Sequence, residues 1–536
     1  MKFNAQRYMY PSRRTVVFGN RGMVATGQPL AAQAGLDILK KGGNAVDAAI
    51  ATAACLTVVE PTSNGIGADN FALVWVKDKL YGLNSSGYAP KAADAAALRA
   101  AGCKEMPKYG WHAVTVPGAP AGWVALSKRF GKLPLTEVMK PAIGYAEEGY
   151  PVSPTMAKLW GKAFANYTKE CKGEEFKHWF DTFAPAGRAP QPGEMWSSGG
   201  HAKTLSLIAE SGAEAFYRGA LAEKIDAYAK KYGAWLSAAD LAGFQSEWVE
   251  PITVNYRGYD VWEIPPNGHG ITALMALNII GGWDFSGARE FEETWHRQIE
   301  AMKLAFVDAM HHVADPRYMK YTSAELLSGA YAAGRRGLIG ETALAPVPGT
   351  PPKGGTVYLA TADGEGNMVS MIQSNYMGFG SGLVVPETGI ALHNRGNNFS
   401  LDEASPNVLA PEKKPYHTII PGFLSRDGKA VGPFGVMGGF MQPQGHVQVV
   451  TNMIDFGMNP QEAIDAPRWQ WVGGKTIEVE QGVPGHIALG LTARGHDIKM
   501  LPDTGTFGRG EIIVRTEYGT LAGATEPRTD GTIAAW

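Results

Sequence analysis

The chain has 536 residues, of which 45% are hydrophobic and 19% are charged, and its formal net charge is -2 at pH 7. This near-neutral balance gives no electrostatic reason to expect a nucleic-acid partner or binding to a membrane surface. The length allows three or four average domains, or one large unit with a substantial core. The three cysteines, Cys55, Cys103 and Cys171, lack metal-like spacing, so we expect unpaired thiols.

The amino-terminal stretch, Met1 to Arg14, is polar and lacks the apolar core of a secretory signal. The longest apolar run, Ala48 to Val59, is too short to span a bilayer. We therefore expect a cytoplasmic protein with no membrane partner. The sequence also lacks a His-Glu-x-x-His motif, a Cys-x-x-Cys pair and a phosphate-binding loop, so it implies no cofactor and no metal.

The first part of the chain is rich in helical patterns. Leu30 to Lys41 has helical apolar spacing, and Ala45 to Val58 follows Asn44, which forms a capping box with Asp47. The segment Glu60 to Gly67 then breaks the helical pattern and leads to a predicted strand at Phe71 to Val76. It is either an ordinary helix-to-strand turn or, as the resemblance set out below implies, a glycine-rich loop near the reaction centre. A loop is predicted at 84–90, and further helices at 123–129, 135–148, 203–211 and 220–232.

The middle of the chain alternates between strand and helix patterns. Val254 to Glu263 predicts one strand, and Ile271 to Ile280 predicts an apolar helix. Glu292 to Val313 is the clearest amphipathic helix, because its large apolar residues recur at steps of three or four. A proline-rich linker, Ala343 to Gly355, follows, and Gln442 to Phe456 predicts a later helix.

A predicted β-hairpin starts directly after this linker. An alternating, β-branched segment begins at Thr356, a turn covers Asp363 to Asn367, and a second run covers Met368 to Gln373. Cutting the bond between Gly355 and Thr356 would give a new amino terminus with both a hydroxyl and an amine. A free amine with an ordinary pKa of about 7.7 to 8 takes the proton from a neighbouring hydroxyl near neutral pH. Gly-Gly-Thr alone is more often a plain junction between a loop and a strand.

A set of ordered segments carries a resemblance. They are Leu30 to Asn44, Val116 to Trp123, Gly355-Thr356, Phe379 to Gly382, Asn394 to Ser400 and Gly438-Gly439. From Met23 to about Arg528 the chain resembles the γ-glutamyltranspeptidase family of N-terminal nucleophile hydrolases. The resemblance implies an α+β fold, a four-layer αββα sandwich. It also implies a precursor that cuts itself into a large segment, 1–355, and a small segment, 356–536. The segments stay together as a heterodimer, and pairing into a heterotetramer is left open.

The resemblance also assigns roles to residues around the nucleophile, Thr356. Ser374 matches a hydroxyl residue that bonds the nucleophile, and the amides of Gly438 and Gly439 match the oxyanion hole. Tyr376 stands where asparagine is usual, and it either donates its O-H group or packs at the strand end.

Three departures from the family pattern concern the substrate. Ser86 stands where transpeptidases use an arginine for the α-carboxylate, and Asn398 where they use an acid for the α-ammonium. Arg395 would repel an ammonium and attract a carboxylate, unless it points to solvent. His417 either touches the substrate or is structural.

Three functions remain open at this stage. The first is an amidohydrolase for a small or carboxylate-bearing acyl group, similar to the oxamate amidohydrolase and cephalosporin acylase members of the family. The second is a γ-glutamyltransferase or glutathione hydrolase. The third is an uncut relative without activity. We expect the acyl-enzyme to be released by water more readily than by transfer to an amine.

Overall fold

The computed structural model describes residues 14–285, 289–346 and 355–536. Most of the predicted linker, 347–354, and nearly all of the polar amino-terminal stretch, 1–13, lie outside the described residues.

Two antiparallel sheets of seven strands each form the centre of the molecule. The first has the order β19 (Thr532–Ala535), β2 (Gly22–Thr26), β10 (Gly355–Asp363), β11 (Met368–Tyr376), β3 (Asp69–Val76), β4 (Lys79–Ser85) and β7 (Glu247–Val249). The second has the order β1 (Val17–Gly19), β18 (Leu521–Thr525), β17 (Arg509–Arg515), β13 (Lys429–Met437), β12 (Gly422–Arg426), β9 (Tyr259–Glu263) and β8 (Ile252–Tyr256). Smaller sheets are formed by β14 (Trp469–Gly473), β15 (Thr476–Glu480) and β16 (Asp497–Leu501), and by β5 (Tyr150–Pro151) and β6 (Met195–Trp196).

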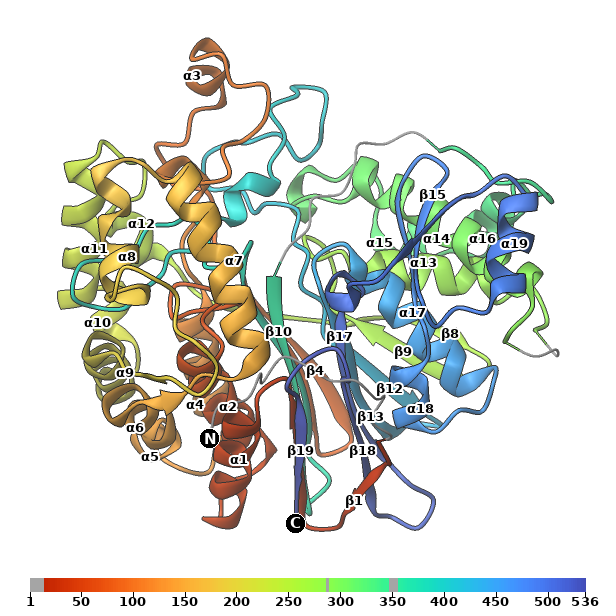
Figure 1. Ribbon diagram of the computed structural model, residues 1–536, viewed down its shortest axis with the longest axis horizontal. Coiled ribbons are helices and arrows are strands. Elements are labelled where there is room, and N and C mark those ends of the chain that lie inside the picture. The colour runs from red at the N-terminus through yellow and green to blue at the C-terminus, as the bar shows by residue number, and fades with distance from the viewer. Residues whose placement is uncertain (1–13, 286–288, 347–354) are drawn as a thin grey trace.

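The two large sheets face each other and are covered by helices on their outer sides (Figure 1). A buried cluster between them joins Phe71 and Tyr358 of the first sheet to Phe423 and Ile513 of the second. Helices α1 and α2 pack on the first sheet, and α13, α14 and α17 belong to the core on the second. Strand β10 lies between two fully buried strands, β2 and β11, which fix its position in the first sheet.

The described residues also form a set of α-helices. Their bounds are α1 (Pro29–Lys40), α2 (Ala45–Val59), α3 (Ala95–Ala100), α4 (Ala119–Phe130), α5 (Leu135–Val138), α6 (Lys140–Glu148), α7 (Pro154–Glu170), α8 (Lys177–Phe183), α9 (Gly199–Ser211), α10 (Glu214–Tyr217), α11 (Ala220–Lys231), α12 (Ala238–Gly243), α13 (Gly270–Ile280), α14 (Glu292–His312), α15 (Ser323–Leu326), α16 (Gly329–Arg336), α17 (Met441–Ile454), α18 (Pro460–Asp465) and α19 (Gly485–Ala493). Among the described residues, none of these helices has the length and apolarity needed to cross a membrane.

Several local predictions are confirmed. Asn44 and Asp47 form the predicted capping box of α2, and all residues of this helix are buried. The predicted hairpin is β10 and β11, and the amphipathic helix is α14. The cysteines are unpaired thiols.

Three predictions of local structure are wrong. The single strand predicted at Val254 to Glu263 is the hairpin of β8 and β9, which turns at Arg257 and Gly258 with positive φ. The single helix predicted at 135–148 is divided at Met139 into α5 and α6, with a proline in the first turn of α6. The loop predicted from Asn84 starts later, because β4 continues to Ser85, which pairs with Asn70 of β3.

Residues on both sides of Gly355 contribute to both sheets. In the first sheet, the earlier strand β2 lies between β19 and β10, and the earlier strand β3 pairs with β11. In the second, β1 pairs with β18, and β9 pairs with β12. The two parts of the chain are therefore interleaved and share one core.

Candidate active site

Thr356 lies at an irregularity in the central hairpin. Gly355 is opposite Tyr376, whereas Val357 is opposite Gln373, so the register between β10 and β11 shifts at Thr356. The Thr356 side chain is buried, and its Oγ1 donates a hydrogen bond to Ser374 Oγ at 3.2 Å. The same Ser374 hydroxyl donates to the carbonyl oxygen of Gly355 at 2.8 Å. The Ser374 hydroxyl thus contacts both Thr356 Oγ1, the predicted nucleophile, and the Gly355 carbonyl group that this nucleophile would attack.

A glutamine from α17 completes the surroundings of the threonine hydroxyl. Gln442 Nε2 donates to Thr356 Oγ1 at 3.5 Å, and its Oε1 accepts from the backbone N-H of Ile420 at 3.0 Å. The backbone N-H of Tyr376 donates to Ser374 Oγ at 2.8 Å. These fixed donors orient the hydroxyl groups without any ionised side chain in contact with them.

Gly438 and Gly439 form the turn between β13 and α17. Their φ angles are +136° and +61°, which L residues with side chains rarely adopt. Among the described residues, neither backbone N-H has a hydrogen-bond acceptor. Gly438 also borders the cavity in front of Gly355. Free backbone donors can stabilise an oxyanion when a reacting carbonyl lies beside them.

Arg395 is completely buried, so the alternative that it points to solvent is wrong. Its Nη1 donates to Thr418 Oγ1 at 2.7 Å, and its guanidinium lies 4.5 Å from the centre of the Tyr376 ring. Nε and Nη2 have no hydrogen-bond partner within the described part of the chain. Burial lowers the pKa of Arg395 to about 10, and the nearby Asp69 acts against this shift, so the side chain remains a cation at neutral pH.

An acid and two histidines lie beside this arginine. His417 Nε2 is 2.9 Å from Asp69 Oδ2, and His393 Nε2 is 3.6 Å from Asp69 Oδ1. Burial lowers the pKa of His417 well below its ordinary value and that of His393 to about 3, so both rings are neutral. Burial raises the pKa of Asp69 to about 7, although Arg395 opposes this shift. His417 is therefore held by Asp69 in this structure.

Ser86 and Asn398 already have hydrogen-bond partners within the protein. The resemblance places these two residues where transpeptidases bind the α-carboxylate and the α-ammonium group of their substrate. Ser86 Oγ donates to Asn84 Oδ1 at 2.8 Å, and Asn267 Nδ2 donates to Ser86 Oγ at 3.3 Å. Asn398 Nδ2 donates to the carbonyl oxygen of Tyr416 at 3.0 Å. Neither residue carries a charge with which to hold an α-carboxylate or an α-ammonium group.

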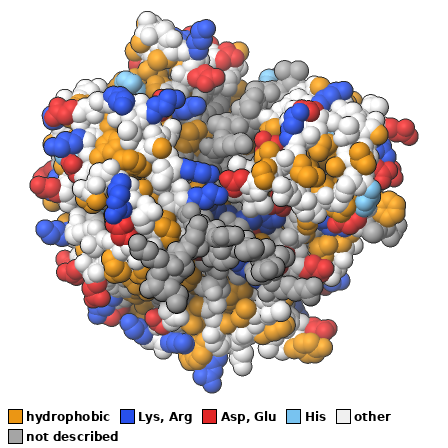
Figure 2. Space-filling view, in the orientation of Figure 1, with side chains coloured by type: hydrophobic (Ala, Val, Ile, Leu, Met, Phe, Trp, Pro, Cys, Tyr) orange, Lys and Arg blue, Asp and Glu red, His pale blue; other side chains and the backbone are white. Residues whose placement is uncertain are grey.

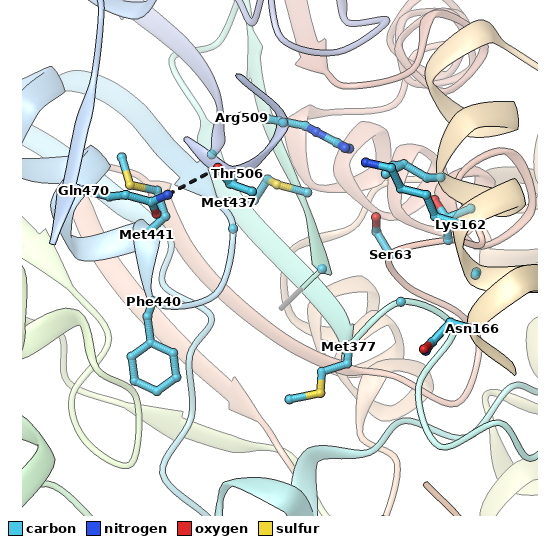
Figure 3. Close-up of a pocket in the computed structure, with 18 of the residues that line it drawn as sticks. Ser63, Lys162, Asn166, Met377, Met437, Phe440, Met441, Gln470, Thr506 and Arg509 are labelled. Carbon is cyan, nitrogen blue, oxygen red and sulfur yellow. Dashed lines mark hydrogen bonds between the residues drawn. The ribbon is translucent and has the colours of Figure 1, made fainter. Parts of the chain in front are cut away.

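A cavity of about 790 Å³ opens in front of Gly355. It is bordered by Met377 and Gly378 after β11, by Gly438, and by residues of α7 and β17 (Figure 3). Figure 2 shows Lys and Arg side chains near the centre of this face of the molecule. A volume of this size is typical of a site for an organic molecule.

One group of potential metal ligands lies elsewhere, between α14 and the start of β16. His296, Glu300 and His496 approach one another, but Lys303 Nζ contacts both Glu300 at 2.7 Å and His496 Nδ1 at 3.4 Å. His296 Nδ1 and His496 Nε2 are 2.9 Å apart, and His296 Nε2 contacts the Gly340 carbonyl oxygen. The lysine and these internal hydrogen bonds already occupy the ligand atoms, which is unfavourable for a cation.

Sequence reasoning missed Gln442 and Asp69. Asp69 lies two residues after Gly67, the end of the glycine-rich segment, and this position is the available signal. Gln442 lies three residues after Gly439, on the helix that begins at the glycine turn.

Comparisons with known proteins identify the chain as a hydrolase. It is 37% identical over 534 residues to the glutathione hydrolase-like YwrD proenzyme of Bacillus subtilis (strain 168), covering 96% of this chain and 98% of the relative. It is 34% identical over 533 residues to the oxamate amidohydrolase proenzyme of Klebsiella pneumoniae, covering 96% and 98%. The crystal structure of cephalosporin acylase from Bacillus halodurans matches with a TM-score of 0.97 and 60% identity, covering 100% of this chain and 99% of the other.

The family model described as gamma-glutamyltranspeptidase matches residues 31–536, and the chain belongs to this family. The resemblance seen in the ordered sequence segments is thus confirmed. The mixed helix and sheet fold agrees with the solved structures of the family.

Proposed function

We propose that the chain cuts itself between Gly355 and Thr356 and then hydrolyses an amide whose acyl group carries a carboxylate. The unpartnered guanidinium edge of Arg395 is the observation that carries the choice of substrate. The names of the relatives agree with this proposal, since two are proenzymes and oxamate is the amide of an acyl group with a carboxylate. The two helix-covered sheets support a four-layer αββα sandwich of the N-terminal nucleophile type.

The first step is the cut itself. Thr356 Oγ1 attacks the carbonyl carbon of Gly355, while the Ser374 hydroxyl donates to the carbonyl oxygen and stabilises its developing charge. The C-N bond breaks, the hydroxyl proton passes to the leaving nitrogen, and Gly355 is left as an ester on Thr356. Water then hydrolyses this ester. The products are a large segment ending in the Gly355 carboxylate and a small segment beginning with the free amine of Thr356.

The second step uses the amine that the cut has created. Thr356 Oγ1 attacks the carbonyl carbon of the substrate amide, and its proton moves to the α-amine of the same residue. The backbone amides of Gly438 and Gly439 stabilise the oxyanion, and the α-amine then protonates the leaving nitrogen. Water attacks the resulting acyl-enzyme and releases the acid. Gln442 and Ser374 hold the threonine oxygen in position throughout.

The acyl carboxylate binds Arg395 in this proposal. Nε and Nη2 lie on one edge of a guanidinium, and together they hold a carboxylate by two charge-assisted hydrogen bonds. Tyr376 covers the guanidinium and connects Arg395 to the Thr356 site, since its backbone N-H donates to Ser374. An α-ammonium group has no acidic partner at Asn398. Oxalyl, succinyl and glutaryl groups therefore fit this site better than γ-glutamyl groups.

Two measurements test the proposal. Mass spectrometry and Edman sequencing of purified protein should show a second chain that begins Thr-Val-Tyr-Leu, and Thr356→Ala should remain a single chain. The cut protein should release p-nitroaniline from a glutaryl anilide at least tenfold faster than from the γ-glutamyl anilide. An intact active protein would refute the cut and favour the uncut relative. Faster turnover of the γ-glutamyl anilide would instead favour a glutathione hydrolase.

A further inference from the structure

Asp69 joins the two segments that position Arg395. One segment carries His393 and Arg395 itself, and the backbone N-H of Arg395 donates to His393 Nδ1 at 3.1 Å. The other segment carries His417 and Thr418, whose Oγ1 accepts from Arg395 Nη1 at 2.7 Å. Asp69 Oδ2 is 2.9 Å from His417 Nε2, and Asp69 Oδ1 is 3.6 Å from His393 Nε2. A single, completely buried carboxylate therefore lies at the junction of both segments.

Neither histidine takes up a proton at this junction near neutral pH. The backbone N-H of Ile419 donates to His417 Nδ1 at 3.4 Å, as that of Arg395 does to His393 Nδ1. Each ring therefore carries its hydrogen on Nε2, the nitrogen that faces Asp69. A second hydrogen, on Nδ1, would point at a backbone N-H, and burial lowers the pKa of both rings. Asp69 is thus the group of these three that changes its charge.

Two cations and one phenol face Asp69 together with the two rings. Burial raises the pKa of Asp69 to about 7, and Arg395, the backbone N-H of Gly87 and Lys414 act against this shift. Among these charges Arg395 acts most strongly, and the Gly87 N-H donates to Asp69 Oδ1 at 3.3 Å. The phenol is that of Tyr217, and burial raises its pKa well above the ordinary value, so it stays neutral. Near pH 7 Asp69 is accordingly divided between its ionised and its neutral form.

The charge of Asp69 controls how much positive charge Arg395 presents to a ligand. When Asp69 is ionised, it offsets part of the guanidinium charge, and when Asp69 is protonated, the guanidinium is uncompensated. An acyl carboxylate at Nε and Nη2 of Arg395 brings a second negative charge into the same buried cluster. Two carboxylates in one buried site disfavour the ionised form of each other, so the acyl carboxylate binds more tightly when Asp69 holds a proton.

We propose that Asp69 positions Arg395 and sets the preference for an anionic acyl group through the proton that it gains or loses. This inference rests on the proposed function, because it requires the acyl carboxylate to bind at Arg395. Amides of dicarboxylic acids, with one carboxylate left free, are then favoured most strongly below neutral pH. Amides with an uncharged acyl group gain nothing from this proton, so the specificity of the site changes with pH.

Two anilides that differ only at the end of the acyl chain test this inference on the cut protein. Glutaryl p-nitroanilide ends in a carboxylate and pentanoyl p-nitroanilide ends in a methyl group, and both release p-nitroaniline. The readout is the ratio of kcat/KM for glutaryl over pentanoyl at constant ionic strength, so the titration of the Thr356 amine cancels. The ratio should rise about threefold to tenfold from pH 8.5 to pH 6, because Asp69 becomes protonated while the glutaryl carboxylate stays ionised.

Asp69→Asn removes the titrating group but retains an oxygen that accepts from His417. Its ratio should be the same at both pH values, and at least as high as that of the unmodified protein at pH 6. A merely structural role would not give this result. Asp47→Asn is the matched control, because Asp47 is also completely buried but accepts from the backbone N-H groups of Asn44 and Lys132. Its ratio should follow the pH dependence of the unmodified protein.

The outcomes separate this inference from the proposed function. A glutaryl preference that does not change with pH in the unmodified protein would overturn the role of Asp69 while the proposed function stands. A pH dependence that persists in Asp69→Asn would overturn it as well. The profile of the unmodified protein decides the question by itself should Asp69→Asn fail to fold. If the glutaryl anilide is not hydrolysed faster than the pentanoyl anilide at any pH, the proposed function fails, and the inference fails with it.

Discussion

Three arginines of this chain present the same guanidinium edge in different surroundings. Arg317 uses Nε and Nη2 to hold both carboxylate oxygens of Asp315, and Arg335 does the same with Asp308. In Arg395 this edge is buried and has no partner among the described residues, although Nη1 is bonded to Thr418. An unpaired buried cation is costly, so a residue of this kind favours an anionic ligand.

Replacing Arg395 should therefore affect substrate binding more than the cut. In Arg395→Gln, kcat/KM for the glutaryl anilide should fall about 100-fold, because a buried partner of a charged group is lost. Arg395→Lys should lose less, since it keeps the charge but not the fork. Steady-state kinetics on cut protein measure both effects. Arg317→Gln removes an arginine with the same edge geometry away from Thr356, and its kinetics should match those of the unmodified protein. Equal kcat/KM values for Arg395→Gln and Arg317→Gln would contradict the assignment.

At the scale of elements, α17 is bounded by two turns that need positive φ. Gly438 before the helix has φ +136°, and a Cβ there would meet Gly508 Cα at 3.1 Å. Gly457 after the helix has φ +61°, and a Cβ there would meet no atom within 4 Å. The two positions share backbone strain, but Gly438 alone borders the cavity.

The pair Gly438→Ala and Gly457→Ala separates strain from catalysis. Each should lower the free energy of unfolding by about 1 to 2 kcal/mol, because an L residue is forced into a positive φ. Gly438→Ala should also lower kcat at least tenfold, because in the proposed oxyanion hole the added methyl group displaces the Gly438 amide. Urea unfolding and kcat are measured on the same preparations of cut protein. A normal kcat in Gly438→Ala would argue against an oxyanion site at this turn.

The sequence predicts those elements whose causes are local. The capping box of Asn44 and Asp47, and the amphipathic repeat of α14, depend on residues within a few positions of one another. Strand β4 also pairs with β7, more than 160 residues later, and no local pattern contains that pairing. The same limit applies to the site. Family motifs point to Thr356 and Arg395, but the free guanidinium edge and the contact of Gln442 arise only from packing of distant segments.

The whole molecule is built so that the proposed cut does not divide it into separate bodies. Strands from before and after Gly355 alternate in both sheets, and the core between the sheets draws on both parts. A buried polar contact adds to this interleaving. His496, from the later part, meets His296, Glu300 and Lys303 of α14. The two segments should therefore remain associated after the cut, without a covalent bond between them.

The His496 contact gives this association a pH dependence whose sign follows from burial. Desolvation, together with the nearby Lys303, lowers the pKa of His496 to about 3, whereas an unfolded histidine has a pKa of about 6.5. The unfolded chain thus binds more protons than the folded one between these values, so stability is present above pH 6.5 and is lost as the pH falls. The contribution of one such histidine is about 1 kcal/mol per pH unit below pH 6.

His496→Gln should therefore flatten the pH dependence of stability. We expect the urea midpoint of the cut protein to fall less between pH 7.5 and pH 5 in His496→Gln than in the unmodified protein, monitored by tryptophan fluorescence. Buried groups outside this contact titrate equally in both proteins, so the difference in slope reports on the contact of His496 with α14 as a whole. His486→Gln is the control, because His486 is exposed on the neighbouring helix α19 and should leave the slope unchanged. Parallel pH curves for His496→Gln and the unmodified protein would show that this histidine does not contribute to holding the segments together.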